Sequence, residues 1–220
     1  MRHLLPGLVL TDESAEWSCQ ILTGPRARAV LEAVGAGADL AKPWLTHQWG
    51  RIAGRDVWLA RVRFAGELGW ELHSRLADTP AVWDAVMAAG EPLGLRPFGM
   101  FALDALRIEK GYRAWKGDLS TDYTVLQGGL DRFVDWAKPA FRGKAALEAE
   151  RQRGVARRFC TLVIAAGAED PPYMSTIWAG DSVVGEVTSG RFGHRVGAVI
   201  GLGMIRADLA APGQAVEVEI

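Results

Sequence analysis

The order of apolar and polar positions predicts a mixed structure for the N-terminal part of the chain. Short apolar runs bounded by glycine turns predict strands, and longer stretches with helical periodicity predict helices. We expect strands at 17–22, 57–64 and 70–73, and helices at 26–34, 79–89 and 97–110. This order of elements predicts an α+β layer in which helices cover one face of an antiparallel sheet.

The pattern changes in the C-terminal part. Residues 111–145 are rich in Gly, Asp and Trp and have little periodicity, so they predict an extended connection that runs over a surface. Beyond residue 155, glycine turns separate short β-rich runs at 159–164, 176–178, 183–188, 198–204 and 216–220. These runs predict a small all-β barrel or sandwich, and we expect the barrel. We therefore expect two domains, 1–145 and 146–220.

Composition narrows the class of protein. The 25 Lys and Arg residues nearly balance the 26 Asp and Glu residues, so no global field attracts nucleic acid or an anionic membrane. No apolar run approaches the length of a membrane-spanning helix. The apolar stretch at 1–10 is interrupted by Pro6 and Gly7, and no small-residue cleavage site follows it. This favours a cytoplasmic protein over an exported one.

The cysteines and histidines give no sequence signature of a metal site. Cys19 and Cys160 lie far apart in apolar, strand-like runs, so we expect both to be buried free thiols. None of the four histidines stands at metal-ligand spacing from another ligand. On this basis we expect no bound metal.

Several segments of the chain stand in a family-specific order. They are GELGWE at 66–71, LRIEKGYRAW at 106–115 with Asp118 after it, FRGKAAL at 141–147, VTSG at 187–190 and GHRVG at 193–197. Together they resemble the aminomethyltransferase superfamily, typified by the T-protein of the glycine cleavage system. The sequences LRIEKGYRAW and SGRFGHRVG most resemble the C-terminal folate module of dimethylglycine and sarcosine dehydrogenases.

The resemblance implies both a reaction and a missing half. The reaction that it implies transfers a one-carbon unit from a small methylated amine to tetrahydrofolate. It further implies that a complete member begins well upstream of the residues that match Met1, and that the upstream half carries the catalytic aspartate. We therefore expect an N-terminally truncated chain and assign no catalytic residue. Because a sheet that has lost strands exposes edges and apolar faces, we expect an oligomer, or a flavin dehydrogenase or separate chain that supplies the rest.

The resemblance also implies a set of folate contacts. Glu71 falls at the position of the family's pterin-binding glutamate, and Phe64 falls where dehydrogenase-type relatives carry tyrosine. Tyr112 and Trp115 lie on the connecting loop with Asp118, and these side chains could line the pocket. A carboxylate can bind the donor edge of a pterin through two hydrogen bonds, and aromatic walls suit its flat ring.

Structural explanations for the same residues stay open. Glu71 could be an exposed strand carboxylate paired with Arg61 or Arg63, and the aromatic side chains could be ordinary core residues. Leu103 stands where the glycine cleavage protein carries a folate-binding arginine, and a leucine supplies neither the charge nor the donors of a guanidinium. Two functions therefore remain. One is a tetrahydrofolate-dependent aminomethyltransferase, and the other is a non-catalytic, truncated folate-binding or interaction module.

Overall fold

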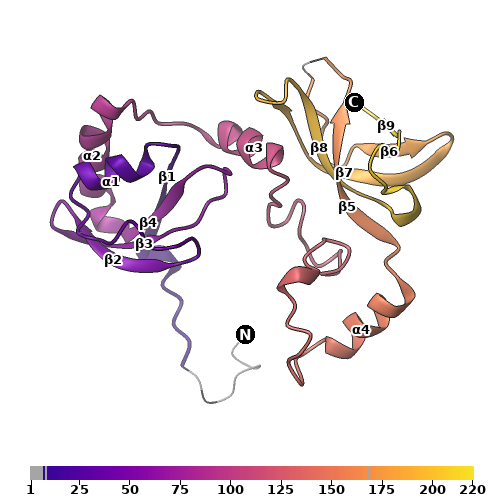
Figure 1. Cartoon of the computed structure of the whole chain (residues 1–220), viewed down its shortest axis with the longest axis horizontal. Coiled ribbons are helices and arrows are strands. Elements are labelled where there is room, and N and C mark those ends of the chain that lie inside the picture. The colour runs from indigo at the N-terminus through magenta and orange to yellow at the C-terminus, as the bar shows by residue number, and fades with distance from the viewer. Residues whose placement is uncertain (1–6, 8, 168) are drawn as a thin grey trace. The chain divides into compact units, whose positions relative to one another are not determined.

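The computed structural model describes residues 7, 9–167 and 169–220, and the chain divides into two compact units at Phe98 and Gly99 (Figure 1). These units are compact groups of contacting residues, so their division does not test the domain boundary that we expect at residue 145. That boundary stays a prediction. Among the described residues, no helix is both long and apolar enough to cross a bilayer.

The first unit is a four-stranded antiparallel sheet covered by helices, as the apolar pattern predicts. The strand order is β1-β4-β3-β2. The bounds are β1 Trp17–Thr23, β2 His47–Ile52, β3 Arg55–Ala60, β4 Gly69–Arg75, α1 Ala27–Ala33 and α2 Thr79–Gly90. Leu31 and Val82 of the helices share one core with Trp70 and Leu72 of β4. Figure 1 shows both helices on the same side of this sheet.

Alternation along the strands leaves the opposite face of this sheet open. Because successive side chains of a strand point to opposite faces, burial of Trp70 and Leu72 beneath the helices directs Glu71 and His73 away from them. The expected strand at 57–64 ends earlier, at Ala60, because residues 61–64 leave the sheet. This places Phe64 on the loop between β3 and β4 rather than within a strand.

The second unit combines helix α3, a long connection, helix α4 and a five-stranded antiparallel sheet with strand order β5-β8-β7-β6-β9. The bounds are α3 Met100–Glu109, α4 Lys144–Arg153, β5 Arg157–Ile164, β6 Thr176–Ala179, β7 Ser182–Gly193, β8 Ala198–Arg206 and β9 Glu217–Val218. Ile108 of α3 packs against Ile200 and Leu202 of β8. Short 3-10 turns lie at Ser14–Glu16, Leu76–Asp78, Glu91–Leu93, Asp131–Phe133 and Ala207–Leu209.

Candidate functional site

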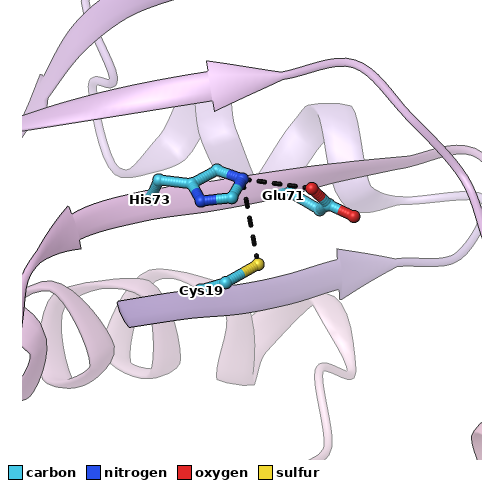
Figure 2. A group of neighbouring side chains, drawn as sticks. All are labelled: Cys19, Glu71 and His73. Carbon is cyan, nitrogen blue, oxygen red and sulfur yellow. Dashed lines mark hydrogen bonds and ion pairs between the residues drawn. The ribbon is translucent and has the colours of Figure 1, made fainter. Parts of the chain in front are cut away.

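Three chemically distinct side chains converge on the open face of the first sheet. Glu71 and His73 lie two positions apart in β4, and Cys19 of β1 is the direct cross-strand partner of His73. His73 Nε2 lies 3.1 Å from Glu71 Oε2 and 3.9 Å from Cys19 Sγ (Figure 2). The Glu71 and His73 side chains retain 34% and 23% of their exposure, so solvent and ligands reach both.

Aromatic rings lie on the same sheet face as this group, and one of them contacts it. Trp58 of β3 is the cross-strand partner of His73, and the two ring centroids are 4.9 Å apart. Trp58 Nε1 donates a 2.9 Å hydrogen bond to His47 Nδ1, which fixes the indole in place. Trp17 and Trp49 form a second pair, with centroids 6.2 Å apart. This face therefore combines a carboxylate with flat apolar surfaces, which is the chemistry that a heteroaromatic ligand requires.

Glu71 is paired with a histidine and not with Arg61 or Arg63, the partners expected if it were only an exposed strand carboxylate. Its described hydrogen bond is with His73. The guanidinium of Arg61 lies 5.5 Å from the Trp70 ring centroid, and that of Arg63 lies 5.4 Å from the Trp44 ring. The expected pairing of Glu71 with Arg61 or Arg63 is therefore wrong.

Cys19 is exposed, which corrects the expectation of a buried thiol. In β1 it is Leu22 that packs into the core with the helices, and alternation carries Cys19 to the open face. Although the residue as a whole is exposed, its sulfur lies 3.9 Å from His73 Nε2, and this partial loss of water, together with the nearby Glu71 carboxylate, raises the pKa of the thiol to about 11. The thiol is therefore protonated at neutral pH and is a poor nucleophile. Cys160 is a half-buried free thiol in β5.

The remaining predicted contacts belong to the second unit, or lie outside the strands. Phe64 is half-buried on its loop. Tyr112 is half-buried, and Trp115 is 70% exposed. Neither of these two is a core residue, so the structural explanation fails for both. Their contact with folate, and that of Phe64 and Glu71, stays a prediction.

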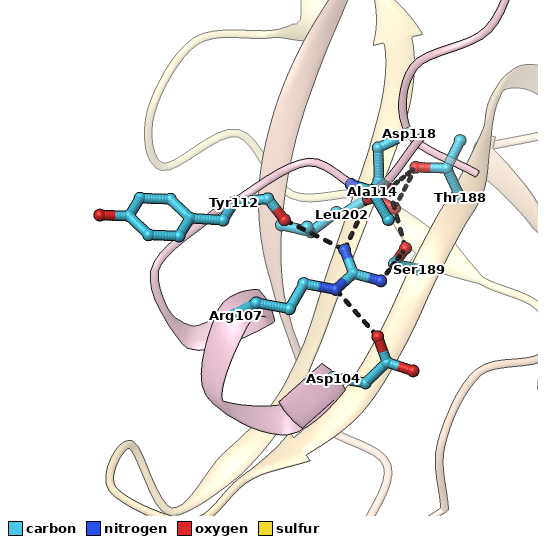
Figure 3. A network of polar contacts seen from close by, with 8 residues as sticks. All are labelled: Asp104, Arg107, Tyr112, Ala114, Asp118, Thr188, Ser189 and Leu202. Carbon is cyan, nitrogen blue, oxygen red and sulfur yellow. Dashed lines mark hydrogen bonds and ion pairs between the residues drawn. The ribbon is translucent and has the colours of Figure 1, made fainter. Parts of the chain in front are cut away.

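Asp118 is a structural anchor and not a pocket group. Its Oδ2 atom accepts a hydrogen bond from Arg107 Nη1 at 2.6 Å, and its Oδ1 atom accepts from Thr188 Oγ1 at 2.5 Å and Ser189 Oγ at 2.9 Å (Figure 3). Arg107 also donates to Asp104 Oδ1 at 3.1 Å. Because Asp118 is fully buried among these partners, the expectation that it could line a pocket is wrong.

The largest of the described cavities in the second unit lies outside the residues that the sequence predicts for the site. A pocket of about 600 Å³ lies between α3 and β7, and its lining includes Phe101, Glu109, Arg191 and His194. The Arg191 guanidinium lies 4.8 Å from the Phe101 ring centroid. Leu103, by contrast, is buried in α3. Arg191 and His194 belong to the SGRFGHR segment, so this motif is the sequence feature that points to the pocket.

Comparison with known proteins gives consistent matches over most of the chain. The family model of the GCVT N-terminal domain matches residues 1–138, and that of the glycine cleavage T-protein C-terminal barrel domain matches residues 157–220. A solved aminomethyltransferase T of the glycine cleavage system from Bartonella henselae superposes with a TM-score of 0.83 at 22% identity, covering 93% of this chain and 55% of that one. This likeness confirms the predicted α+β fold.

Curated relatives include both free-standing and fused proteins. Human mitochondrial dimethylglycine dehydrogenase is 36% identical over 90% of this chain and 23% of its own length. Mouse mitochondrial sarcosine dehydrogenase is 40% identical over 92% of this chain and 22% of its own length. An aminomethyltransferase of Frankia alni is 37% identical over 97% of this chain and 58% of its own length. The chain thus spans between about a fifth and three fifths of these relatives.

Proposed function

Because the chain belongs to the glycine cleavage T-protein (GCVT) family, we propose that it binds tetrahydrofolate and takes part in one-carbon transfer to it from a methylated glycine-type amine. Glu71 is the observation that carries this proposal. Its carboxylate stands on an open, aromatic-lined sheet face, and it is held by a single described side-chain hydrogen bond from His73.

The chemistry of the pterin matches this surface. The pterin edge presents N–H donors that a carboxylate can accept through two parallel hydrogen bonds. Glu71 keeps free lone pairs, because one of its oxygens faces His73 while the other is available. We propose Phe64, in the same unit as Glu71, as a further contact with the cofactor. For Tyr112 and Trp115, in the second unit, a folate contact is a separate proposal that rests on the resemblance alone. Each is at least partly accessible, as a stacking side chain must be.

We assign no catalytic acid to this chain. In this proposal the group comes from another polypeptide segment, either a separately encoded half or a flavin dehydrogenase. The relatives support such partners, because two of the proteins that contain a matching segment are named as dehydrogenases and are several times longer than the match.

Leu103 favours a second candidate function, a non-catalytic folate-binding or interaction module. This leucine is buried in α3 and offers no polar atom to a ligand, although the T-protein resemblance implies an arginine there. Loss of a folate-binding arginine fits an interaction module better than an active transferase.

Calorimetric titration of the purified chain with a stable reduced folate tests the proposal. We expect micromolar binding, at least a tenfold loss in Glu71→Gln, and unchanged affinity in Asp56→Asn. Asp56 is the matched control, since it is an exposed carboxylate on the same sheet, paired with Arg51 at 3.3 Å. Absence of heat with a folded protein would exclude folate binding by this chain. Binding without amine-dependent formation of methylenetetrahydrofolate, even with a candidate dehydrogenase added, would favour the non-catalytic module.

A further inference from the structure

Cys19, Glu71 and His73 offer one sulfur, one oxygen and one nitrogen to a common point on the open sheet face. All of the ligand atoms of this triad lie within 4.8 Å of one another. We propose that this triad binds a divalent transition-metal ion, with Zn²⁺ as the preferred ion. This reverses the expectation of no metal, which rested on sequence spacing. Spacing could not reveal the site, because β1 brings Cys19 beside a histidine 54 residues away.

The separations fit tetrahedral coordination. Bond lengths of about 2.3 Å to sulfur and about 2.0 Å to nitrogen or oxygen place neighbouring ligands of zinc roughly 3.3–3.6 Å apart. The distances here are 3.9 Å from Cys19 Sγ to His73 Nε2 and 3.1 Å from His73 Nε2 to Glu71 Oε2. Small side-chain rotations close the difference, and the backbone positions are already fixed by the strand pairing.

The ligand set selects the class of metal. Thiolate and imidazole together suit zinc and its softer neighbours, whereas Mg²⁺ and Ca²⁺ prefer oxygen ligands alone. On binding, the Cys19 thiol releases its proton to solvent, and the neutral imidazole of His73 exchanges its Nε2 proton for one on Nδ1. The sulfur, Nε2 and a Glu71 oxygen then form bonds to the ion, and the hydrogen bond between His73 and Glu71 is lost. The two positive charges of the ion then offset the thiolate and the Glu71 carboxylate, which otherwise repel each other.

The surroundings of the triad orient its ligands and leave room for a fourth. The Trp58 ring packs against His73, and the Trp58 indole is itself held by His47. This ring contact limits the rotation of the imidazole. Three protein ligands on an accessible surface leave one coordination position for water or a small ligand, as in catalytic zinc sites rather than closed structural ones.

Titration of the reduced full-length chain with Co²⁺ tests the proposal, because Co²⁺ replaces Zn²⁺ and reports its ligands by absorption. We expect one ion per chain, visible bands of tetrahedral intensity, a thiolate-to-metal charge-transfer band in the near ultraviolet, and loss of all of these on adding Zn²⁺. Cys19→Ser should abolish the charge-transfer band, and His73→Ala should weaken affinity at least tenfold. Cys160→Ser is the matched control and should bind like the parent chain.

Two outcomes would overturn the proposal. One is a folded, reduced parent chain without the charge-transfer band. The other is a band that persists in Cys19→Ser and disappears in Cys160→Ser, which would place the ion at the other thiol. Circular dichroism of each variant separates loss of a ligand from loss of the fold. Since the probe is the metal alone, the result does not depend on folate binding. Both proposals use the Glu71 carboxylate, so the ion and a reduced folate should compete for it.

Discussion

Glu71 and Asp118 are two carboxylates in opposite surroundings, because Glu71 is accessible on the open face of the first sheet and Asp118 is fully buried in the second unit. The motif GELGWE singles out Glu71 as a folate contact, and that role stays a prediction. The partners of Glu71 were not predictable, because Cys19 becomes its neighbour only when β1 pairs with β4. The same limit applies to Asp118, whose partners Thr188 and Ser189 lie about 70 residues further along the chain.

Asp118 should be among the residues most sensitive to substitution. The substitution Asp118→Asn removes the closest counter-ion of the buried Arg107 guanidinium, whose Nη1 lies 2.6 Å from Asp118 Oδ2. Removing one partner of a buried ion pair costs about 3–5 kcal/mol, so we expect a loss of that order in the stability of the second unit. Hydrogen exchange at the β7 and β8 amides measures it. Asp208→Asn, whose partner Arg206 is exposed, should leave the protection unchanged.

Tyr123 should give the second unit a pH dependence at alkaline pH. Burial, and the 3.0 Å hydrogen bond that the phenol donates to Glu186, raise its pKa from 10.0 to about 12. The folded chain therefore holds this proton more tightly than the unfolded chain. The stability that results is present in full below pH 10 and is lost as the pH rises to about 12.

Ultraviolet titration of tyrosinate checks this assignment. The chain has 3 tyrosines, and we expect Tyr123→Phe to remove a titration phase near pH 12. In the parent chain, the free energy of unfolding should fall between pH 10 and 12. In Tyr123→Phe, this fall should be smaller. An unchanged titration curve would contradict the assignment.

At the scale of elements, periodicity predicted the class of nearly every helix and strand in the first unit, but it missed β2. The segment HQWGRI has one apolar residue on its inward face, Ile52, and carries Gly50 in the middle. Gly50 lets β2 lie close to the backbone of Ala36, because a Cβ at this position would lie 2.4 Å from the Ala36 carbonyl oxygen. A strand whose inward face is made by a glycine has no alternating apolar signal to detect.

Gly185 fixes the spacing between β7 and β8 in the same way. A Cβ at this position would lie 2.1 Å from the Met204 carbonyl oxygen, which belongs to backbone that cannot rotate aside. We expect Gly185→Ala to destabilise the second unit by about 1–3 kcal/mol, as overpacking does. Denaturant unfolding followed by circular dichroism measures it. The control is Gly99→Ala, which meets nothing within 4 Å and has a φ of −93°. Equal stability of the two variants would refute a role for this contact.

At the scale of the molecule, the open face of the first sheet predicts association. Trp49 is 59% exposed there, and Ile21 of the edge strand β1 is exposed on the same face. Apolar surface of this kind is typical of interaction sites. We expect the purified chain to form oligomers at micromolar concentration, and Trp49→Lys to shift it towards the monomer. Light scattering with size-exclusion chromatography measures both, and a parent chain that stays monomeric throughout would contradict the expectation.

The Asp118 network has a consequence for the order in which the second unit folds. It joins Arg107 and Asp118 to β7, and its hydrogen bonds span 70 to 82 residues of sequence. Closing such long loops is slow, because chain entropy is lost before the contacts that repay it are made. The Arg107 and Asp118 side chains therefore lack their Thr188 and Ser189 partners until β7 has formed. During synthesis, β7 leaves the ribosome more than sixty residues after Asp118, so this buried network is completed only late in translation.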